Sequence, residues 1–328
     1  MPNGYPDTPE FMGLNTPVRT ESHAPNLVVK GTLPPELEGA FFRAVPDPAF
    51  PPRYEGDTAI SGDGMISRFL FKNGRVDHDI RFVKTARHQA EVKAGRSLFG
   101  RYRNPYTDDP SVAGVDRTVA NTTPVWHAGR LLMTKEDGRP YRVDPLTLET
   151  LGSFDFDGKL KSETMTAHVR VDPVSGNLYF FGYEAGGLAS RQIAYCVANP
   201  AGDLISEQWF EAPYCGMVHD FAITRNWAVF PIFPTTADLE RIKAGGPHWV
   251  HHQDLESWVG FMPRDGKASD IRWLRGPKGV SVYHIMNAFE DDGGVIHMDM
   301  HISDTNAFPF IREDSGICLL YTSPSPRD

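Results

Sequence analysis

Three histidines in this 328-residue chain have a spacing that suggests a metal site. His168 lies in TMTAHVRVDP, His219 in GMVHDFAIT and His284 in SVYHIMNAFE, and each precedes a turn by about one strand length. An imidazole among apolar neighbours needs a hydrogen-bond partner, a proton or a metal ion. A single histidine of this kind is most often a core residue with satisfied hydrogen bonds, but three in equivalent positions suggest a shared ligand.

The spacing of these histidines fits the period of a β-propeller. They are about 50 and 65 residues apart, and one blade occupies roughly 40–50 residues. Because equivalent positions on successive blades face the same central channel, three imidazoles would meet near one point. Neutral nitrogen ligands suit iron, zinc or copper and disfavour magnesium or calcium. Spacing alone leaves two interpretations open, metal ligands and core histidines.

The elements that must position these residues are predicted to be short β-strands. Turn signals between alternating or apolar segments predict hairpins at Asn73-Gly74, Asp144-Pro145, Asp172 to Gly176, Arg225-Asn226 and Asp291 to Gly294. The segment TTADLERIKAGG, residues 235–246, opens with threonine, closes in glycine and predicts one short helix. Many short strands between Gly, Pro and Asp turns indicate an all-β sandwich, barrel or propeller, although WD and kelch signatures are absent from the sequence.

The composition is that of an ordinary soluble protein, with 40% hydrophobic and 23% charged residues. A formal net charge of −9 without basic runs argues against nucleic acid or an anionic membrane as the main partner. The scattered Cys196, Cys215 and Cys318 form neither a disulfide framework nor a zinc motif, which favours a reducing compartment. Because the sequence shows neither an apolar signal core nor a run that approaches a membrane span, we expect a soluble, cytoplasmic protein.

Longer segments resemble the carotenoid cleavage oxygenase family. TAHVRVDPVSGNLYFFGY, MVHDFAIT and YHIMNAFEDDG resemble its metal-ligand segments, and LEGAFFRAVPDP, SGDGMISRF and TKEDGRPYRVDPLTLETLG resemble its N-terminal segments. The resemblance extends from about Pro34 to about Ile311. It implies a seven-bladed β-propeller, capped by a dome of loops, in which four axial histidines hold a non-haem Fe(II). It also implies cleavage of a conjugated carbon–carbon double bond with O2 to give two carbonyl products.

The resemblance assigns roles to individual residues. It implies that His168, His219 and His284 are three of the four iron ligands. Glu136, in TKEDGRP, matches a carboxylate that accepts the remaining N–H of a ligand histidine and so fixes its tautomer. An exposed turn carboxylate is the alternative interpretation of Glu136.

Two further residues make the chain most similar to the lignostilbene dioxygenase branch, whose members cleave 4-hydroxystilbenes. Tyr102 in LFGRYRNPYTDD and Lys135 in LLMTKEDG match the residues that bind the substrate's para-hydroxyl. Deprotonation of that phenol moves electron density onto the central double bond, and a partly buried lysine with a tyrosine donor stabilises the phenolate. A solvated turn lysine and a core or loop tyrosine are the alternatives. Ile60, in DTAISGDGM, stands where the branch has an aromatic residue and would still supply an apolar wall.

The C-terminal part departs from the family. The resemblance stops around residues 314–316, and the Ser/Pro-rich end ICLLYTSPSPRD matches nothing in the family. We therefore predict an N-terminal extension over residues 1–30 and a single incomplete propeller of about five blades over residues 31–314. Residues 315–328 are predicted to be a foreign or read-through tail. The fourth histidine ligand is not found in this chain.

The remaining histidines are expected to have structural rather than ligand roles. The stretch GGPHWVHHQDLES is polar and predicts a loop, and VIHMDMHISD follows the His284 hairpin. The histidines concerned are His248, His251 and His252 in the first stretch and His297 and His301 in the second.

These observations predict an Fe(II) dioxygenase that splits the central double bond of 4-hydroxystilbenes into two aromatic aldehydes, as in lignin aromatic catabolism. The truncated chain itself is expected to be inactive. Two alternatives stay open. One is a carotenoid or apocarotenoid cleavage oxygenase, and the second is a non-catalytic propeller binding module in which the histidines lie in the core or bind zinc. The sequence leaves the oligomeric state and the identity of the stilbene undecided.

Overall fold

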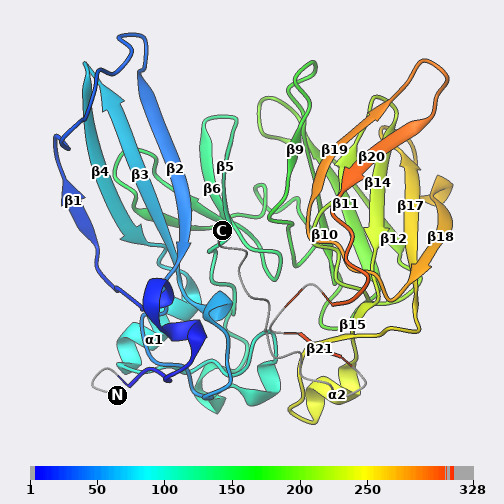
Figure 1. Cartoon of the computed structure of the whole chain (residues 1–328), viewed down its shortest axis with the longest axis horizontal. Coiled ribbons are helices and arrows are strands. Elements are labelled where there is room, and N and C mark those ends of the chain that lie inside the picture. Colours follow the sequence, from blue (N-terminus) through cyan, green and yellow to red (C-terminus); the bar gives the residue numbers. More distant parts are fainter. Residues whose placement is uncertain (1–3, 307, 309–310, 314–328) are drawn as a thin grey trace, which may run out of the picture. The chain divides into compact units, whose positions relative to one another are not determined.

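The computed structural model describes residues 4–306, 308 and 311–313 (Figure 1). It contains two compact units. Unit 1 comprises Met1–Gly182 and Cys196–Glu207, and unit 2 comprises Tyr183–Tyr195 and Gln208–Asp328. Strands dominate both units, and the helices are few and short. Over the described residues, every helix is too short or too polar to cross a membrane.

Two four-stranded antiparallel sheets form most of unit 1. The first has the order β1-β4-β3-β2 and the second the order β5-β6-β7-β8. Asn73 and Gly74 join β3 to β4 with φ values of 52° and 70°, as a type I′ hairpin turn requires. The strands are β1 Ser22–Ala24, β2 Gly39–Pro46, β3 Gly64–Lys72, β4 Arg75–Phe82, β5 Thr123–His127, β6 Arg130–Thr134, β7 Tyr141–Val143 and β8 Thr150–Ser153.

A single apolar cluster joins these two sheets. Ile66 of β3 and Leu131, Met133 of β6 are at most 2% exposed and belong to the same group of packed side chains. The hydroxyl of Tyr141, from β7, accepts a hydrogen bond from the Ala86 amide at 3.0 Å. Burial of each large apolar side chain contributes roughly 1.5–3 kcal/mol, so this cluster is a main source of stability for unit 1.

A third sheet has the order β12-β11-β10-β9, and its residues are divided between the two units. Its strands are β9 Arg170–Val171, β10 Leu178–Tyr183, β11 Gln192–Ala198 and β12 Leu204–Glu211. All six residues of β10 are buried, which agrees with the continuous apolar run LYFFGY rather than with an alternating pattern.

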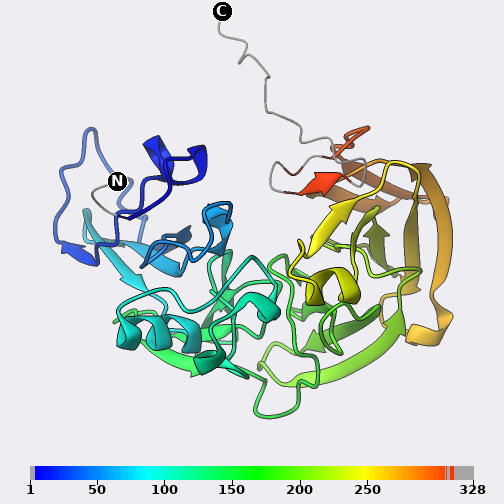
Figure 2. The ribbon, with the colours of Figure 1, turned by 90° about the horizontal axis from the view of Figure 1, so that it is seen from below.

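Unit 2 contains a four-stranded antiparallel sheet, a two-stranded hairpin and a small mixed sheet. The first has the order β13-β14-β17-β18, and Figure 2 shows β18 as its outer strand, drawn in orange. The second is β19-β20, and the third is β15-β16-β21. The strands are β13 Ala222–Ile223, β14 Trp227–Ile232, β15 Thr235–Ala237, β16 Trp249–His251, β17 Glu256–Pro263, β18 Arg272–Lys278, β19 Ile285–Glu290, β20 Ile296–Met300 and β21 Arg312–Glu313.

The described part of the chain contains the α-helices α1 Ala86–Ala94 and α2 Leu239–Lys243. Thr85 caps α1 by accepting a hydrogen bond from the His88 amide at 3.1 Å, and Gly95 ends it in the left-handed region. The short 3₁₀ helices are η1 Pro9–Phe11, η2 Gly13–Asn15, η3 Ala59–Ser61, η4 Pro105–Thr107, η5 Pro110–Val112 and η6 Ala268–Asp270.

The structure confirms the predicted hairpins and the all-β class. All five predicted turns separate consecutive strands, and several sheets have the four antiparallel strands typical of a propeller blade. The predicted boundaries at residues 30 and 314 stay predictions, although β1 already pairs with β4 at residues 22–24. The predicted tail, residues 315–328, lies outside the described residues, and so does Cys318. Cys196 and Cys215 are buried free thiols.

Two local predictions were wrong. The helix expected over residues 235–246 is shorter, because Thr235–Ala237 forms β15 and pairs with β16, and Asp238 then caps α2. The polar stretch expected to be a loop contains strand β16, whose three residues are all buried. The α1 helix was not predicted, because its residues do not form an apolar face; the capping pair Thr85 and Gly95 was the available signal.

We expect Ile66→Ala to destabilise the chain by about 2–5 kcal/mol, because it leaves a cavity in the cluster that joins the first two sheets. Ile66→Val should cost only about 0.5–1.5 kcal/mol. Val28→Ala is the control, since that side chain is 92% exposed. Urea unfolding followed by tryptophan fluorescence measures the three values, and equal costs for Ile66→Ala and Val28→Ala would contradict this description of the core.

Candidate functional site

His219 and His284 form a close pair in unit 2. His219 lies shortly before β13 and His284 immediately before β19. Their Nε2 atoms are 3.3 Å apart, and their ring centroids are 5.0 Å apart. Tyr283 packs edge-on against the His219 ring at 5.3 Å and stacks on the His284 ring at 5.6 Å. Both imidazoles are therefore held with the same ring nitrogen facing the other.

This geometry fits a shared metal ion. Two Nε2 atoms 3.3 Å apart that were each about 2.0–2.2 Å from one ion would subtend an angle of about 100–110° at it. That angle is normal for adjacent ligands of a first-row metal. A hydrogen bond between the rings is the alternative, and it requires one Nε2 to carry a proton. The pair is thus suited to bind a metal when both imidazoles are protonated on Nδ1.

His168 occupies the corresponding place in unit 1. It lies two residues before β9, is half-buried, and its backbone amide donates to the Thr166 hydroxyl at 3.0 Å. The three predicted ligands therefore precede β9, β13 and β19, which belong to three different sheets. This placement agrees with the predicted hairpins. Ligation of one ion by all three histidines stays a prediction.

Tyr102 and Lys135 lie together in unit 1. Lys135 directly follows β6, is 3% exposed, and places its ammonium 5.6 Å from the centroid of the Tyr102 ring. The Tyr102 backbone amide donates to Asp57 Oδ1 at 3.3 Å. Lys135 is therefore not a solvated turn lysine, which was the alternative interpretation of the sequence. Burial of an ammonium group is unfavourable unless a partner compensates for the lost water.

The environment of Tyr102 keeps its hydroxyl protonated. Burial of the hydroxyl raises the pKa of Tyr102 well above its usual value, and the carboxylates of Glu136 and Asp137 raise it further. The Arg103 guanidinium opposes this rise and hydrogen-bonds the Tyr102 hydroxyl. The Tyr102 side chain is therefore a hydrogen-bond donor at neutral pH.

Glu136 and Arg103 form a buried ion pair beside these residues. Arg103 Nη1 lies 3.7 Å from Glu136 Oε1, and their side chains are 5% and 6% exposed. Glu136 is thus not an exposed turn carboxylate. Its predicted hydrogen bond to a ligand histidine stays a prediction. Arg103 was missed in the sequence, and its direct adjacency to Tyr102 was the only available signal.

Ile60 lies in η3 and is half-buried. Its backbone carbonyl accepts a hydrogen bond from Asn121 Nδ2 at 3.0 Å, and the same amide group donates to the Gly62 carbonyl at 2.8 Å. A side chain on Gly64 would meet the backbone of Ala120 at 2.3 Å, which explains the glycine in the segment SGDGM. The hydrogen bonds from Asn121 therefore fix the backbone of the segment that carries the Ile60 side chain.

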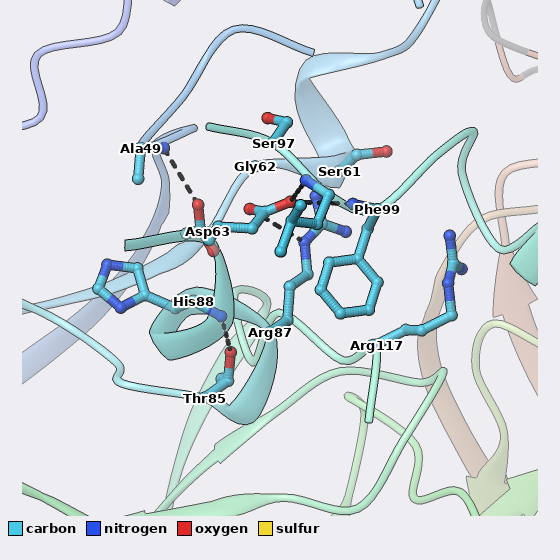
Figure 3. A network of polar contacts seen from close by, with 12 residues as sticks. Ala49, Ser61, Gly62, Asp63, Thr85, Arg87, His88, Ser97, Phe99 and Arg117 are labelled. Atoms are coloured by element: carbon cyan, nitrogen blue, oxygen red, sulfur yellow. Dashed lines mark hydrogen bonds and ion pairs between the residues drawn. The ribbon is translucent and has the colours of Figure 1, made fainter. Parts of the chain in front are cut away.

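A buried polar network supports the segment that leads to Tyr102 (Figure 3). Glu91, on α1, accepts hydrogen bonds from the amides of Leu98 and Phe99 at 2.8 and 3.1 Å. The Arg87 guanidinium lies over the Phe99 ring at 5.2 Å from its centroid. Burial raises the pKa of Glu91 above its usual value. These contacts fasten residues 98–99 to α1, three residues before Tyr102.

Most of the histidines that were predicted to have structural roles make polar contacts. His248 Nε2 lies 3.0 Å from Glu184 Oε2, and both side chains are almost fully buried. His251, at 0% exposure, contacts the Thr235 hydroxyl at 3.1 Å and the Gly279 carbonyl at 3.0 Å. The expected loop position was therefore wrong for His251, which lies in β16, whereas His248 lies in the bend before that strand; a structural role agrees with the contacts of both. Three more of the histidines predicted to have structural roles are His252, bonded to Thr236, His297, bonded to Asp291 and stacked on Phe289, and the exposed His301.

Comparisons with known proteins cover most of the chain. Residues 15–316 match the model of the family described as retinal pigment epithelial membrane protein, RPE65. Isoeugenol monooxygenase of Pseudomonas nitroreducens is 48% identical over 302 residues, which is 92% of this chain and 63% of that protein.

Two solved structures are similar as well. The crystal structure of Pseudomonas brassicacearum lignostilbene dioxygenase matches with a TM-score of 0.92 and 44% identity over 95% of this chain and 65% of that chain. Cobalt-substituted apocarotenoid oxygenase of Synechocystis matches with a TM-score of 0.75 and 27% identity over 93% of this chain and 64% of that chain.

The chain thus spans somewhat less than two thirds of the length of these relatives. The relatives are oxygenases, and their solved structures share the all-β carotenoid oxygenase fold. The family match includes the segments of all three histidines as well as Tyr102 and Lys135. The chain therefore belongs to the RPE65, or carotenoid oxygenase, family.

Proposed function

We propose that this chain supplies the catalytic propeller of a non-haem Fe(II) dioxygenase that cleaves the central double bond of 4-hydroxystilbenes. Dioxygen and the alkene would give two aromatic aldehydes, one oxygen atom entering each product. The observation that carries this proposal is the buried lysine beside a protonated tyrosine, Lys135 and Tyr102. The similarity to lignostilbene dioxygenase over 95% of the chain supports the same substrate class.

The proposed iron ligands of this chain are His168, His219 and His284. The 3.3 Å separation of the His219 and His284 Nε2 atoms supports this assignment, and a similar structure contains cobalt as a substituted metal. Iron(II) held by neutral imidazoles would supply the capacity to activate dioxygen next to the alkene. Glu136 is proposed to accept the remaining N–H of one ligand and so fix its orientation.

Lys135 and Tyr102 are proposed to bind the phenol oxygen of the substrate. The ammonium of Lys135 stabilises the phenolate as a charge partner, and the Tyr102 hydroxyl donates a hydrogen bond to the same oxygen. The resulting phenolate is more electron-rich than the phenol, and conjugation carries this electron density to the alkene. Burial of Lys135 and of the Tyr102 hydroxyl strengthens their interaction with the phenolate, because the local dielectric constant is low.

The half-buried Ile60 bears on the size of the substrate. An aliphatic side chain offers contact area but no aromatic stacking surface. A second candidate substrate is therefore a 4-hydroxyphenylpropene, which has the phenol and the conjugated alkene but lacks the second ring. The 48% identity to isoeugenol monooxygenase favours this candidate specifically. Both candidates use the phenol-binding pair in the same way.

A carotenoid substrate and a purely binding role have less support. A carotenoid or apocarotenoid has no phenol for Lys135 and Tyr102 to bind, and the match to apocarotenoid oxygenase is weaker in both TM-score and identity. A non-catalytic binding module would not need a buried lysine beside a protonated tyrosine. We further propose that the protein acts in the cytoplasm on small aromatic alkenes and O2.

Lys135→Ala in the active protein should suppress cleavage of 4-hydroxystilbene by roughly 10²–10⁴-fold and leave the iron content unchanged, because the lysine acts on the phenol rather than on the metal. Tyr102→Phe should cost less, since it removes one hydrogen bond and keeps the ring. Steady-state kinetics with matched iron analysis measures both effects.

The control is a substrate methylated at the para-oxygen, which cannot form a phenolate. This substrate should be poor for the parent protein and respond little to either substitution. If Lys135→Ala slows both substrates equally, phenolate stabilisation is wrong and the carotenoid-type alternative gains support. Isoeugenol assayed in parallel separates the two phenolic candidates by their kcat/KM values.

The 328-residue chain alone should bind iron weakly and turn over hydroxystilbenes slowly or not at all, because it spans only 65% of the similar lignostilbene dioxygenase chain. Iron reconstitution followed by aldehyde detection tests this expectation. Turnover at a rate typical of enzymes, ~1–10³ s⁻¹, would show that the three histidines and this part of the propeller suffice.

A further inference from the structure

The hairpin that carries His284 has little burial of its own. Among the described residues, β19 and β20 form a sheet of two strands, and most of their residues are exposed or half-buried. Met286 and Phe289, for example, are 67% and 47% exposed. Because an isolated two-stranded hairpin is marginally stable in water, contacts to the neighbouring sheet must fix its position.

Asp220 makes one such contact directly beside the histidine pair. This carboxylate is 5% exposed, and its Oδ2 accepts a hydrogen bond from the Ile285 amide at 2.9 Å. Its Oδ1 accepts from the Phe221 amide at 2.8 Å. Asp220 follows His219 in the chain, and Ile285 follows His284. A single side chain therefore links the two backbone segments that carry the paired imidazoles.

A second carboxylate makes a similar contact at the far end of β19. Glu290 Oε1 accepts hydrogen bonds from the Thr224 hydroxyl at 2.5 Å and the Asn226 amide at 2.7 Å. Its Oε2 accepts from Asn226 Nδ2 at 2.7 Å. These hydrogen bonds link the turn after β13 to the end of β19. The Asp220 carboxylate links the starts of the same two strands.

Apolar packing between the two carboxylates completes the contact. Ile285 is 8% exposed and packs in one cluster with Ala222 of β13 and Val229 of β14. This packing is non-directional and leaves the strands some freedom to slide, whereas a hydrogen bond to one backbone amide fixes their register. The two carboxylates differ in one respect that matters here: only Asp220 lies next to the histidines.

We propose that Asp220 is a positioning residue that sets the spacing of the His219 and His284 imidazoles and thereby their affinity for a metal ion. The metal part of this inference rests on the proposed function. Loss of a group that orients metal ligands typically weakens metal binding about 10–100-fold. The same loss leaves the Ile285 amide without its buried acceptor, which also increases the opening of the strand end.

Co(II) serves as the probe, because its binding to the 328-residue chain is read from visible absorption without any turnover. Asp220→Ala should raise the Co(II) dissociation constant about 10–100-fold relative to the parent chain. Asp220→Asn retains one carbonyl acceptor, so its Co(II) dissociation constant should lie between those of the parent chain and Asp220→Ala. Glu290→Ala is the matched control, since it removes a half-buried carboxylate that also links β13 to β19 but lies away from the histidines.

Hydrogen exchange of the Ile285 amide supplies a readout that needs no metal. Exchange should accelerate in Asp220→Ala and stay close to the parent rate in Glu290→Ala. Thermal unfolding of each variant, with Asp220→Asn as the mildest change, separates local loosening from global unfolding.

The outcomes decide the two claims separately. Unchanged Co(II) affinity in Asp220→Ala, or equal weakening in Asp220→Ala and Glu290→Ala, would overturn the positioning role. Absence of Co(II) binding by the parent chain would count against the proposed metal centre. In that case, an unchanged exchange rate of the Ile285 amide in Asp220→Ala would contradict the proposal that Asp220 fixes the start of β19. Faster exchange would support it.

Discussion

Two of the three candidate metal ligands, His168 and His219, depend on hydrogen bonds from neighbouring strands, because the strands that follow them, β9 and β13, are too short to hold a side chain in place. β9 and β13 span two residues each, Arg170–Val171 and Ala222–Ile223. Fixing the backbone of a residue costs roughly 1–2 kcal/mol of conformational entropy, which two ladder positions do not offset. The longer and buried β10 and β14 therefore act as the templates on which β9 and β13 are ordered. In the proposed account, this arrangement and the Asp220 bond to Ile285 together set the 3.3 Å approach of His219 and His284.

The residues that are proposed to bind the phenol depend on a different constraint, the burial of charge. Lys135, Arg103 and Glu136 are each at most 7% exposed, and taking such groups out of water is unfavourable. Removing one member of a buried ion pair typically costs about 3–5 kcal/mol, because the other charge stays buried without compensation. A cluster of this kind is weak evidence for stability and stronger evidence for a site that binds a polar group. The network of Glu91 and Arg87 fastens the preceding segment and so holds Tyr102 near Lys135.

Much of the fold could be predicted from local sequence chemistry. The Asn73-Gly74 pair adopts positive φ at both positions, so the turn residues alone determined the hairpin between β3 and β4. The helix α1 was missed because it lacks an apolar stripe, and its caps carry the signal instead. The polar composition around His248 and His251 predicted a loop, which was wrong for the residues that form β16. Those histidines are buried through partners, Glu184 and Gly279, that lie far away in the sequence.

The candidate site shows the same division between local and tertiary information. The positions of His168, His219 and His284 before β9, β13 and β19 followed from the hairpin pattern. The burial of Lys135 and its ion-paired neighbour Arg103 required the tertiary structure, because a lysine or arginine in a turn is usually solvated. The bond from Asp220 to Ile285 spans 65 residues and has no local signature.

Joint ligation of one metal ion by His168, His219 and His284 is the hypothesis on which the proposed chemistry depends. X-ray absorption at the iron edge of the Fe(II)-loaded protein, compared between the parent and His168→Ala, tests it without any turnover. We predict imidazole nitrogen scatterers at roughly 2.0–2.2 Å, with one imidazole fewer in the variant. An unchanged spectrum in His168→Ala, or a first shell made of carboxylate oxygen or sulfur, would contradict this hypothesis.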